Sequence, residues 1–337
     1  NKRDGFCEEL VKELTGCEAA TIVNNNAAAT MLTLNTTAEG KEVVISRGQL
    51  VEIGGAFRIP DVLRRSGGTL VEVGCTNKTH LRDYEAAITE NTGALMKVHT
   101  SNYRLVGFVS EVPIGEMVEL GNRHDIAVID DLGAGALIDF RSWGFPEEPL
   151  VQDSVAAGAD LITISADKLI GGPQGGIILG REEWVKKIRK NPLSRVFRVG
   201  KLTLIALEAT LKFFLDRKRA LAEHPTTRML TMPLDELERR ARAIAAEIGE
   251  LSGATIEVGE DTSEVGSGAF PAHQIRTFTV KISPTGRHAD EIARALRLRP
   301  LAVFTRIHHD RIVIDPRTLQ EGEVAEVAEA VREVLGE

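Results

Sequence analysis

The chain has 337 residues, enough for one large domain and a smaller one. Hydrophobic residues make up 43% and charged residues 27%, an ordinary globular composition that excludes a disordered or fibrous protein. Aromatic residues make up only 4% and the net charge is −8, which argues against general nucleic-acid binding. The sequence shows no membrane-length apolar run, no secretory leader and no metal-ligand spacing among its three cysteines, so we expect a cytoplasmic protein.

Short apolar runs alternate with helical patterns through the first two thirds of the chain. Helical patterns cover residues 8–14, 27–34, 83–88, 116–123 and, later, 202–215 and 234–251. The expected strands are 19–23, 43–46, 69–73, 94–99, 126–129, 161–165 and 176–179. Strands that alternate with helices predict an α/β fold with a mainly parallel sheet and helices on both faces.

The last third of the chain has a different pattern. A strand is expected at 275–282, a helix at 288–296, a strand pair from 302–307 and 311–314, and an amphipathic helix at 323–335. These elements predict a small C-terminal α/β domain after the large one. We place the large domain at residues 1–221 and the small one at 222–337.

One lysine stands at the carboxyl end of an expected buried strand. Lys168 follows the apolar run 161–164 and precedes a glycine-rich turn. Ligand crevices of open α/β sheets form at such strand ends, and a desolvated lysine there can form a Schiff base. Ser165, three residues earlier, suits a contact with a cofactor phosphate. A lysine that only ends a strand is the alternative.

Two other polar segments follow expected strands. Asp131 comes after the run 126–129, and a buried aspartate there could keep a pyridine nitrogen protonated. Asn25, Asn26 and Ala27 start a helix, where backbone amides and asparagine side chains can bind an anion. The alternatives are an aspartate that caps the next helix and a plain asparagine cap.

Several cationic and histidine residues are further candidates. Arg195 and Arg198 lie in a basic segment, 181–201, that suits phosphate groups. Arg47 follows a strand and could lie on a cofactor ring or form a surface salt bridge, and His99 could face the crevice or a structural turn. His308 and His309 are adjacent on an expected strand and point to opposite faces, so no metal site is predicted there.

Taken together, these segments resemble the bacterial selenocysteine synthases, the L-seryl-tRNA(Sec) selenium transferases. Members of this family are pyridoxal-phosphate enzymes with the aspartate-aminotransferase fold (fold type I). The similarity extends from Asp4 to the C-terminus and is densest up to Thr210. The segments that carry it are 23–28, 46–62, 97–103, 131–133, the glycine-rich segment from Asp167, and 202–210.

The resemblance implies roles for the candidate residues. Lys168 would carry pyridoxal 5'-phosphate and Asp131 would pair with its pyridine nitrogen, with Asn25, Asn26, Ala27, Arg47, His99 and Ser165 completing the cofactor site. Arg195 and Arg198 would face the selenium donor or the tRNA terminus. The implied reaction eliminates water from seryl-tRNA(Sec) and adds selenophosphate.

The resemblance also implies a homo-oligomer built as a ring of dimers, and a further N-terminal region that the family has and this chain lacks. Two other interpretations stay open at this point. One is a related pyridoxal-phosphate lyase that acts on a small amino acid or an amino sugar phosphate. The other is a scaffold that assembles without a cofactor.

Overall fold

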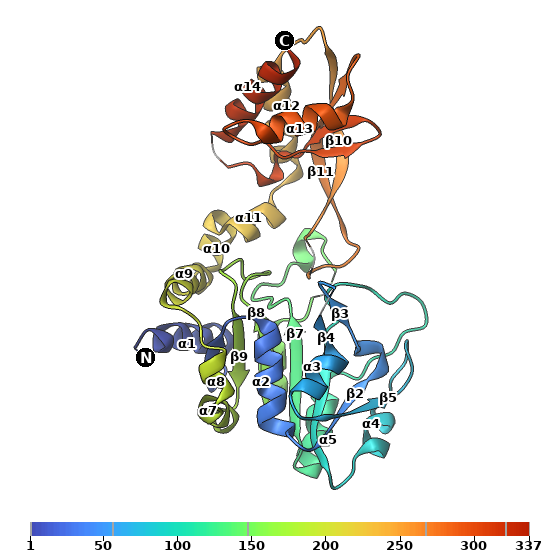
Figure 1. Cartoon of the computed structure of the whole chain (residues 1–337), viewed down its shortest axis with the longest axis vertical. Helices are drawn as coiled ribbons and strands as arrows, with labels where there is room; N and C mark the ends of the chain where they lie inside the picture. Colours follow the sequence, from blue (N-terminus) through green and yellow to red (C-terminus); the bar gives the residue numbers. More distant parts are fainter. Residues whose placement is uncertain (1, 56, 147, 267, 321, 337) are drawn as a thin grey trace. The chain divides into compact units, whose positions relative to one another are not determined.

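The computed structural model describes residues 2–55, 57–146, 148–266, 268–320 and 322–336 (Figure 1). Its residues form two compact units. The first contains the chain up to Arg228 together with Gly266–Ala272, and the second contains Met229–Val265 and the chain from His273 onward. The boundary expected at residues 221 and 222 falls inside helix α10 (Arg217–Glu223). That residues 1–221 and 222–337 are separate domains stays a prediction.

The first unit is built on a seven-stranded sheet in the order β1-β9-β8-β7-β6-β2-β5. Strands β5, β2, β6, β7 and β8 pair in parallel, whereas β9 runs antiparallel to both of its neighbours. The α/β class with a mainly parallel sheet is therefore confirmed. The strands are β1 (Ala19–Val23), β2 (Glu42–Ser46), β5 (Thr69–Val73), β6 (Thr92–Val98), β7 (Ala127–Gly133), β8 (Leu161–Ser165) and β9 (Gly176–Gly180), and a short ribbon pairs β3 (Glu52–Ile53) with β4 (Phe57–Arg58).

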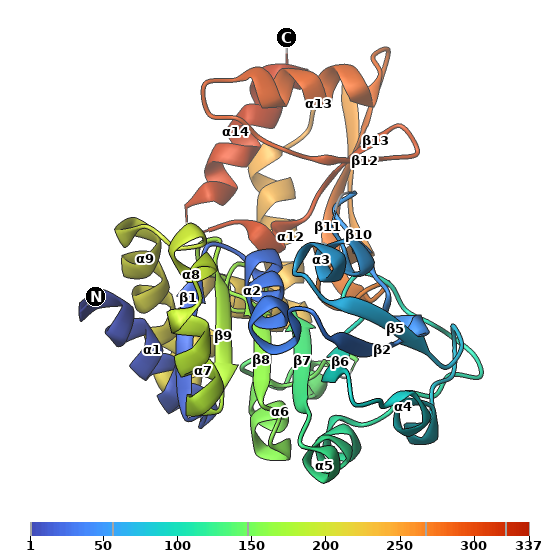
Figure 2. The same ribbon diagram turned by 60° about the horizontal axis from the view of Figure 1, so that its bottom comes forward.

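Helices cover both faces of this sheet. Successive side chains of β9 point to opposite faces and pack against different helices. Ile177 and Leu179 pack in one cluster with residues of α1 and α9, while Ile178 packs in another with residues of α2 and α7. Figure 2 shows α2 and α7 in front of the strands. The helices of this unit are α1 (Lys2–Thr15), α2 (Asn26–Ala38), α3 (Ile59–Arg65), α4 (Leu81–Ala87), α5 (Ile114–His124), α6 (Val151–Ala157), α7 (Glu182–Lys190), α8 (Leu193–Val196), α9 (Lys201–Leu211) and α10, and α11 (Pro225–Thr231) leads into the second unit.

Several elements of the first unit differ in length from their expected ranges, strand β7 and the helix expected at 202–215 among them. Strand β7 continues past the apolar run 126–129 to Gly133, because Asp130 and Asp131 find hydrogen-bond donors inside the fold. The helical pattern at 202–215 becomes α9 followed by a 3₁₀ turn at Lys212–Leu215.

The second unit contains a four-stranded antiparallel sheet in the order β10-β11-β13-β12. Ile244, Ile292 and Val331, one from each of its long helices, share a core with Val280 and Ile312. The elements are α12 (Leu234–Ile248), β10 (Ala254–Glu264), β11 (Gln274–Pro284), α13 (Ala289–Leu298), β12 (Arg306–His308), β13 (Arg311–Ile314) and α14 (Glu323–Leu335). None of the helices in the described parts of the chain is long and apolar enough to cross a lipid bilayer.

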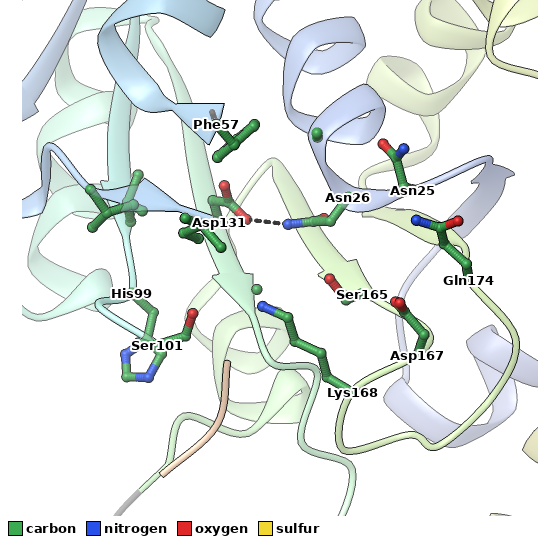
Figure 3. Close-up of a pocket in the computed structure, with 15 residues that line it drawn as sticks. Asn25, Asn26, Phe57, His99, Ser101, Asp131, Ser165, Asp167, Lys168 and Gln174 are labelled. Atoms are coloured by element: carbon green, nitrogen blue, oxygen red, sulfur yellow. Dashed lines mark hydrogen bonds between the residues drawn. The ribbon is translucent and has the colours of Figure 1, made fainter. Parts of the chain in front are cut away.

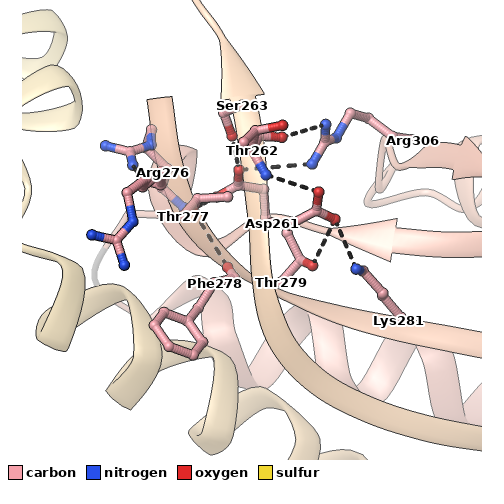
Figure 4. A network of polar contacts seen from close by, with 11 residues as sticks. Asp261, Thr262, Ser263, Arg276, Thr277, Phe278, Thr279, Lys281 and Arg306 are labelled. Atoms are coloured by element: carbon pink, nitrogen blue, oxygen red, sulfur yellow. Dashed lines mark hydrogen bonds and ion pairs between the residues drawn. The ribbon is translucent and has the colours of Figure 1, made fainter. Parts of the chain in front are cut away.

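Strand β10 was not predicted from the sequence, because the polar residues in its second half interrupt the alternation of apolar and polar residues. Those residues pair across the sheet instead (Figure 4). Asp261 accepts a hydrogen bond from Thr279 Oγ1 at 3.2 Å and lies 3.2 Å from Lys281 Nζ. Thr277 Oγ1 donates to Asp315 at 3.1 Å. Cross-strand polar pairs thus stabilise a long ribbon that has little apolar surface.

Asp130 gives the first unit a testable pH dependence. Burial raises the pKa of this carboxyl to about 6, although the Ser154 hydroxyl donates to it at 2.6 Å. Because the pKa of Asp130 is higher in the folded protein than in the unfolded chain, the protonated carboxyl favours folding. This contribution to the free energy of unfolding is fully present below about pH 4 and is lost as pH rises through about 6.

We therefore expect Asp130→Asn to gain stability relative to the parent chain between pH 4 and 7, by on the order of 2 kcal/mol. Urea unfolding at several pH values measures this difference. Glu119→Gln, an equal charge change on the exposed face of α5, serves as the control. A difference between Asp130→Asn and the parent that does not change with pH would contradict the assignment.

Candidate active site

A pocket of about 240 Å³ opens at the carboxyl ends of β6, β7 and β8, beside the N-terminus of α2 (Figure 3). The carboxyl ends of parallel strands are where α/β sheets bind ligands. All of its lining residues belong to the first unit. They are Asn25, Asn26, Ala27, Val51, Ile53, Phe57, Val98, His99, Ser101, Asp131, Gly133, Ser165, Asp167, Lys168 and Gln174.

Asp131 lies in the wall of the pocket, with its carboxylate held from two neighbouring elements. Asn26 Nδ2 and Thr163 Oγ1 donate to Oδ1, each at 2.9 Å, and Thr30 Oγ1 donates to Oδ2 at 3.0 Å. The residue is only 4% exposed. Burial raises the pKa of the Asp131 carboxyl, and the three hydrogen bonds act in the opposite direction. These donors fix the carboxylate, and no cation of the described residues is in hydrogen-bond contact with it.

Lys168 enters the pocket from the turn that follows β8. The turn is closed by hydrogen bonds from Gly171 N to Lys168 O and from Gly172 N to Ala166 O, both 2.8 Å. Burial lowers the pKa of the Lys168 amine, while Asp131, Asp167 and Glu148 oppose this effect. A partly desolvated amine is neutral more often and is therefore a better nucleophile.

Gly268 leaves room for this lysine. A Cβ atom at position 268 would lie 2.8 Å from Lys168 Nζ and 2.7 Å from Cε, so a side chain there would displace the amine. Position 268 also has a φ of +102°, which favours glycine. Gly268 therefore forms part of the wall around the lysine.

The asparagine turn forms the opposite side of the pocket. Asn25 caps α2, since its Oδ1 accepts a hydrogen bond from Ala28 N at 2.8 Å. Strand β9 passes so close that a Cβ at Gly176 would lie 2.2 Å from Asn25 O. In Figure 3, Ser165 and Gln174 lie near this turn. The arrangement can bind an anionic group through the helix N-terminus and neutral polar side chains.

The structure brings most of the sequence-predicted residues into one place. Lys168, Asp131, Asn25, Asn26, Ala27, His99 and Ser165 all line the pocket. Arg47 does not, because its exposed guanidinium pairs with Glu72 at 3.1 Å and donates to Gly74 O at 2.9 Å. A contact between Arg47 and a cofactor stays a prediction.

Arg195 and Arg198 also lie outside this pocket. Both side chains are exposed, and Arg198 lines a separate cavity of about 360 Å³ together with Glu8 and Arg189. The backbone at Arg198 pairs with Val23, just before the asparagine turn. The predicted role of the two arginines is therefore not tested by this geometry.

Sequence reasoning missed several polar residues of the site. Thr30 and Thr163 hold Asp131, and the signal for Thr163 was a polar residue between two isoleucines of an apolar strand. Ser101 lies in the segment that was expected to face the crevice. Within the described chain, Ser101 Oγ and Asn26 Oδ1 are buried without a hydrogen-bond partner. A ligand in the pocket can supply the missing partners.

Comparison with known proteins identifies the family. The chain matches the family model of L-seryl-tRNA selenium transferase over residues 1–320. The L-seryl-tRNA(Sec) selenium transferase of Nitratidesulfovibrio vulgaris is 52% identical over 336 residues, which cover 99% of this chain and 72% of that protein. This chain belongs to the L-seryl-tRNA selenium transferase family. The relative from Alkaliphilus metalliredigens is 49% identical over 97% of the chain and 70% of its own length.

Solved structures support the fold of this selenium transferase family member. D-Glucosaminate-6-phosphate ammonia-lyase aligns with a TM-score of 0.67 at 23% identity, covering 99% of this chain and 86% of that one. Apo CalE6, a methionine gamma lyase from Micromonospora echinospora, aligns with a TM-score of 0.50 at 15% identity, covering 99% and 87%. At these identities the likeness concerns the fold alone, and it confirms the expected fold-type I architecture.

The close approach of β9 to the asparagine turn predicts the effect of a single methyl group. We expect Gly176→Ala to destabilise the chain by about 1–3 kcal/mol, because the new Cβ must push Asn25 away. Chemical denaturation measures the loss. Gly259→Ala, in strand β10 with open space around the position, is the matched control and should cost little. Equal losses of stability in Gly176→Ala and Gly259→Ala would contradict the prediction, because they would show that the asparagine turn moves aside at no cost.

Proposed function

We propose that this chain converts seryl-tRNA(Sec) to selenocysteinyl-tRNA(Sec), with pyridoxal 5'-phosphate as cofactor and selenophosphate as selenium donor. The observation that carries the proposal is the meeting of the Lys168 amine and the Asp131 carboxylate in one pocket. Membership of the L-seryl-tRNA selenium transferase family, with 52% identity to a relative of that name, supports the substrate.

The pocket residues fit this cofactor. Pyridoxal phosphate requires an amine for its aldehyde, a carboxylate for its pyridine nitrogen and donors for its phosphate. Lys168 and Asp131 supply the first two, and the N-terminus of α2 with Ser165 and Gln174 supplies the third. The unpartnered Ser101 Oγ and Asn26 Oδ1 leave capacity for further hydrogen bonds to a ligand.

The bound cofactor supplies an electron sink for the carbon that bears the substrate's amino group. The residues of this chain supply the proton transfers. The Lys168 amine, its pKa lowered by burial, can accept a proton from the seryl α-carbon and return it to the departing hydroxyl. Asp131, fixed by three donors, holds a proton at the ring nitrogen. Apolar side chains of Ile53, Phe57 and Val98 limit water in the pocket.

The decisive experiment is a selenium-transfer assay with seryl-tRNA(Sec) and selenophosphate, run with the chain extended by its family's N-terminal region. The proposal expects selenocysteinyl-tRNA as product. Turnover of free serine or an amino sugar phosphate, with none of seryl-tRNA, would instead indicate a related pyridoxal-phosphate lyase. A colourless protein that binds no pyridoxal phosphate would indicate a scaffold.

A homo-oligomer, arranged as a ring of dimers as the family resemblance implies, is part of the proposal. Val106 and Phe108 support it, because each is 86% exposed in the segment after β6 and offers apolar surface to a second copy. Light scattering measures the assembly directly. A monomer at micromolar concentration would contradict it.

Lys168 is expected to be the residue that binds the cofactor covalently. Lys168→Ala should therefore remove the visible absorbance of the protein loaded with pyridoxal phosphate, and should leave no label after reduction with borohydride. Absorbance spectra and mass spectrometry of the reduced protein measure both effects. Lys186→Ala, on the exposed face of α7, should keep the parent spectrum. A parent-like spectrum for Lys168→Ala would refute the assignment.

Arg195 and Arg198 are expected to act on anionic substrates and not on the cofactor. Arg195→Ala and Arg198→Ala should bind pyridoxal phosphate normally but lower selenium transfer by about 100-fold. Cofactor titration and the transfer assay separate the two effects. Lys190→Ala, an exposed basic residue of α7, controls for loss of positive charge. Full transfer activity in both arginine variants would remove them from the site.

A further inference from the structure

Glu148 is a buried carboxylate next to the pocket that the sequence analysis did not single out. It precedes α6, and its side chain is only 5% exposed. Its Oε1 lies 3.1 Å from Nε2 of His99. A buried carboxylate is costly unless a donor or a cation accompanies it. The nearby imidazole of His99 can therefore lower the free-energy cost of burying Glu148.

His99 is fixed through its backbone at the end of β6. Its N–H donates to Asp131 O at 2.9 Å, and its carbonyl accepts from Ser101 N at 2.9 Å. These bonds hold the main chain but leave the imidazole free to rotate about its side-chain bonds. The ring lines the pocket, so its orientation matters to any ligand there. The 3.1 Å contact between Nε2 and Glu148 Oε1 restricts this rotation.

Glu148 also lies within electrostatic reach of Lys168. Together with Asp131 and Asp167, it opposes the lowering of the Lys168 pKa by burial. The carboxylate, the imidazole and the amine thus share one electrostatic environment. Asp130 also lies within electrostatic reach of His99, because both Lys97 and His99 oppose the raising of the Asp130 pKa by burial.

We propose that Glu148 is a positioning residue of this site, which pairs with Nε2 of His99 and fixes the orientation of its ring in the pocket. Nε2 of His99 and Oε1 of Glu148 are both buried and form no hydrogen bond with other described residues, so the 3.1 Å contact makes each the polar neighbour of the other. The same physical arrangement orients a histidine in other enzymes, where loss of the carboxylate lowers turnover strongly. The inference deepens the proposed function and rests on it for the identity of the ligand.

The pairing itself can be tested on the protein without cofactor. His99→Gln should lower the melting temperature, because it leaves the Glu148 charge buried without its imidazole. Adding Glu148→Gln should restore part of that loss, since it removes the unpaired charge. A double variant no more stable than His99→Gln would overturn the pairing. This outcome does not depend on the enzymatic reaction.

The positioning role requires the loaded protein. Glu148→Gln, which keeps the size of the side chain, should change the visible circular dichroism of the bound cofactor and lower kcat of transfer at least about tenfold, with KM little changed. Glu111→Gln is the matched control, because Glu111 is an exposed carboxylate paired with Lys97 at 3.3 Å. It should leave the dichroism and kcat at parent values.

Coupling to His99 distinguishes positioning from a general structural effect. In a His99→Gln background, Glu148→Gln should cause no further loss of kcat and no further change in dichroism. Equal losses in both backgrounds would overturn the proposal, as would parent-like dichroism and kcat in Glu148→Gln. If transfer activity is absent from the parent as well, the proposed function fails, and the melting and dichroism results still decide the role of Glu148.

Discussion

Asp131 is only 4% exposed, and a buried carboxylate needs hydrogen-bond donors. The donors that Asp131 finds determine the arrangement of the pocket. Its hydrogen bonds come from Asn26 and Thr30 on α2 and from Thr163 on β8. The helix that supplies two of these donors also presents its N-terminus to the pocket. One set of hydrogen bonds therefore fixes both the carboxylate and the N-terminus of α2, at positions set by the sheet.

The order of the strands explains why distant residues meet. Strands β6, β7 and β8 are adjacent and parallel, so their carboxyl ends place His99, Asp131 and Lys168 along one edge. Strand β9 then returns antiparallel and brings Gly176 beneath the asparagine turn. The glycines after Lys168 close the turn that directs its amine inward. Neutral donors and burial, more than neighbouring cations, define the chemistry of this pocket.

Much of the fold and the centre of the site could be predicted from the sequence. Apolar runs indicated the strands of the large sheet, because parallel strands buried on both faces consist mainly of apolar residues. Lys168 and Asp131 were found because each follows such a run. Strand β10 was missed because its stability comes from cross-strand polar pairs such as Asp261 with Lys281. Glu148 gave no local signal, since its significance depends on a contact with His99, 49 positions earlier in the sequence.

The segment 266–272 affects how this protein can be divided into fragments. It belongs to the first unit, although it connects two strands of the second, and its Gly268 borders the Lys168 side chain. A fragment that stops at Arg228 would consequently be missing a piece of its own lysine wall. An intact first unit would need residues 266–272 as well, supplied by a spliced-in peptide or by circular permutation of the gene.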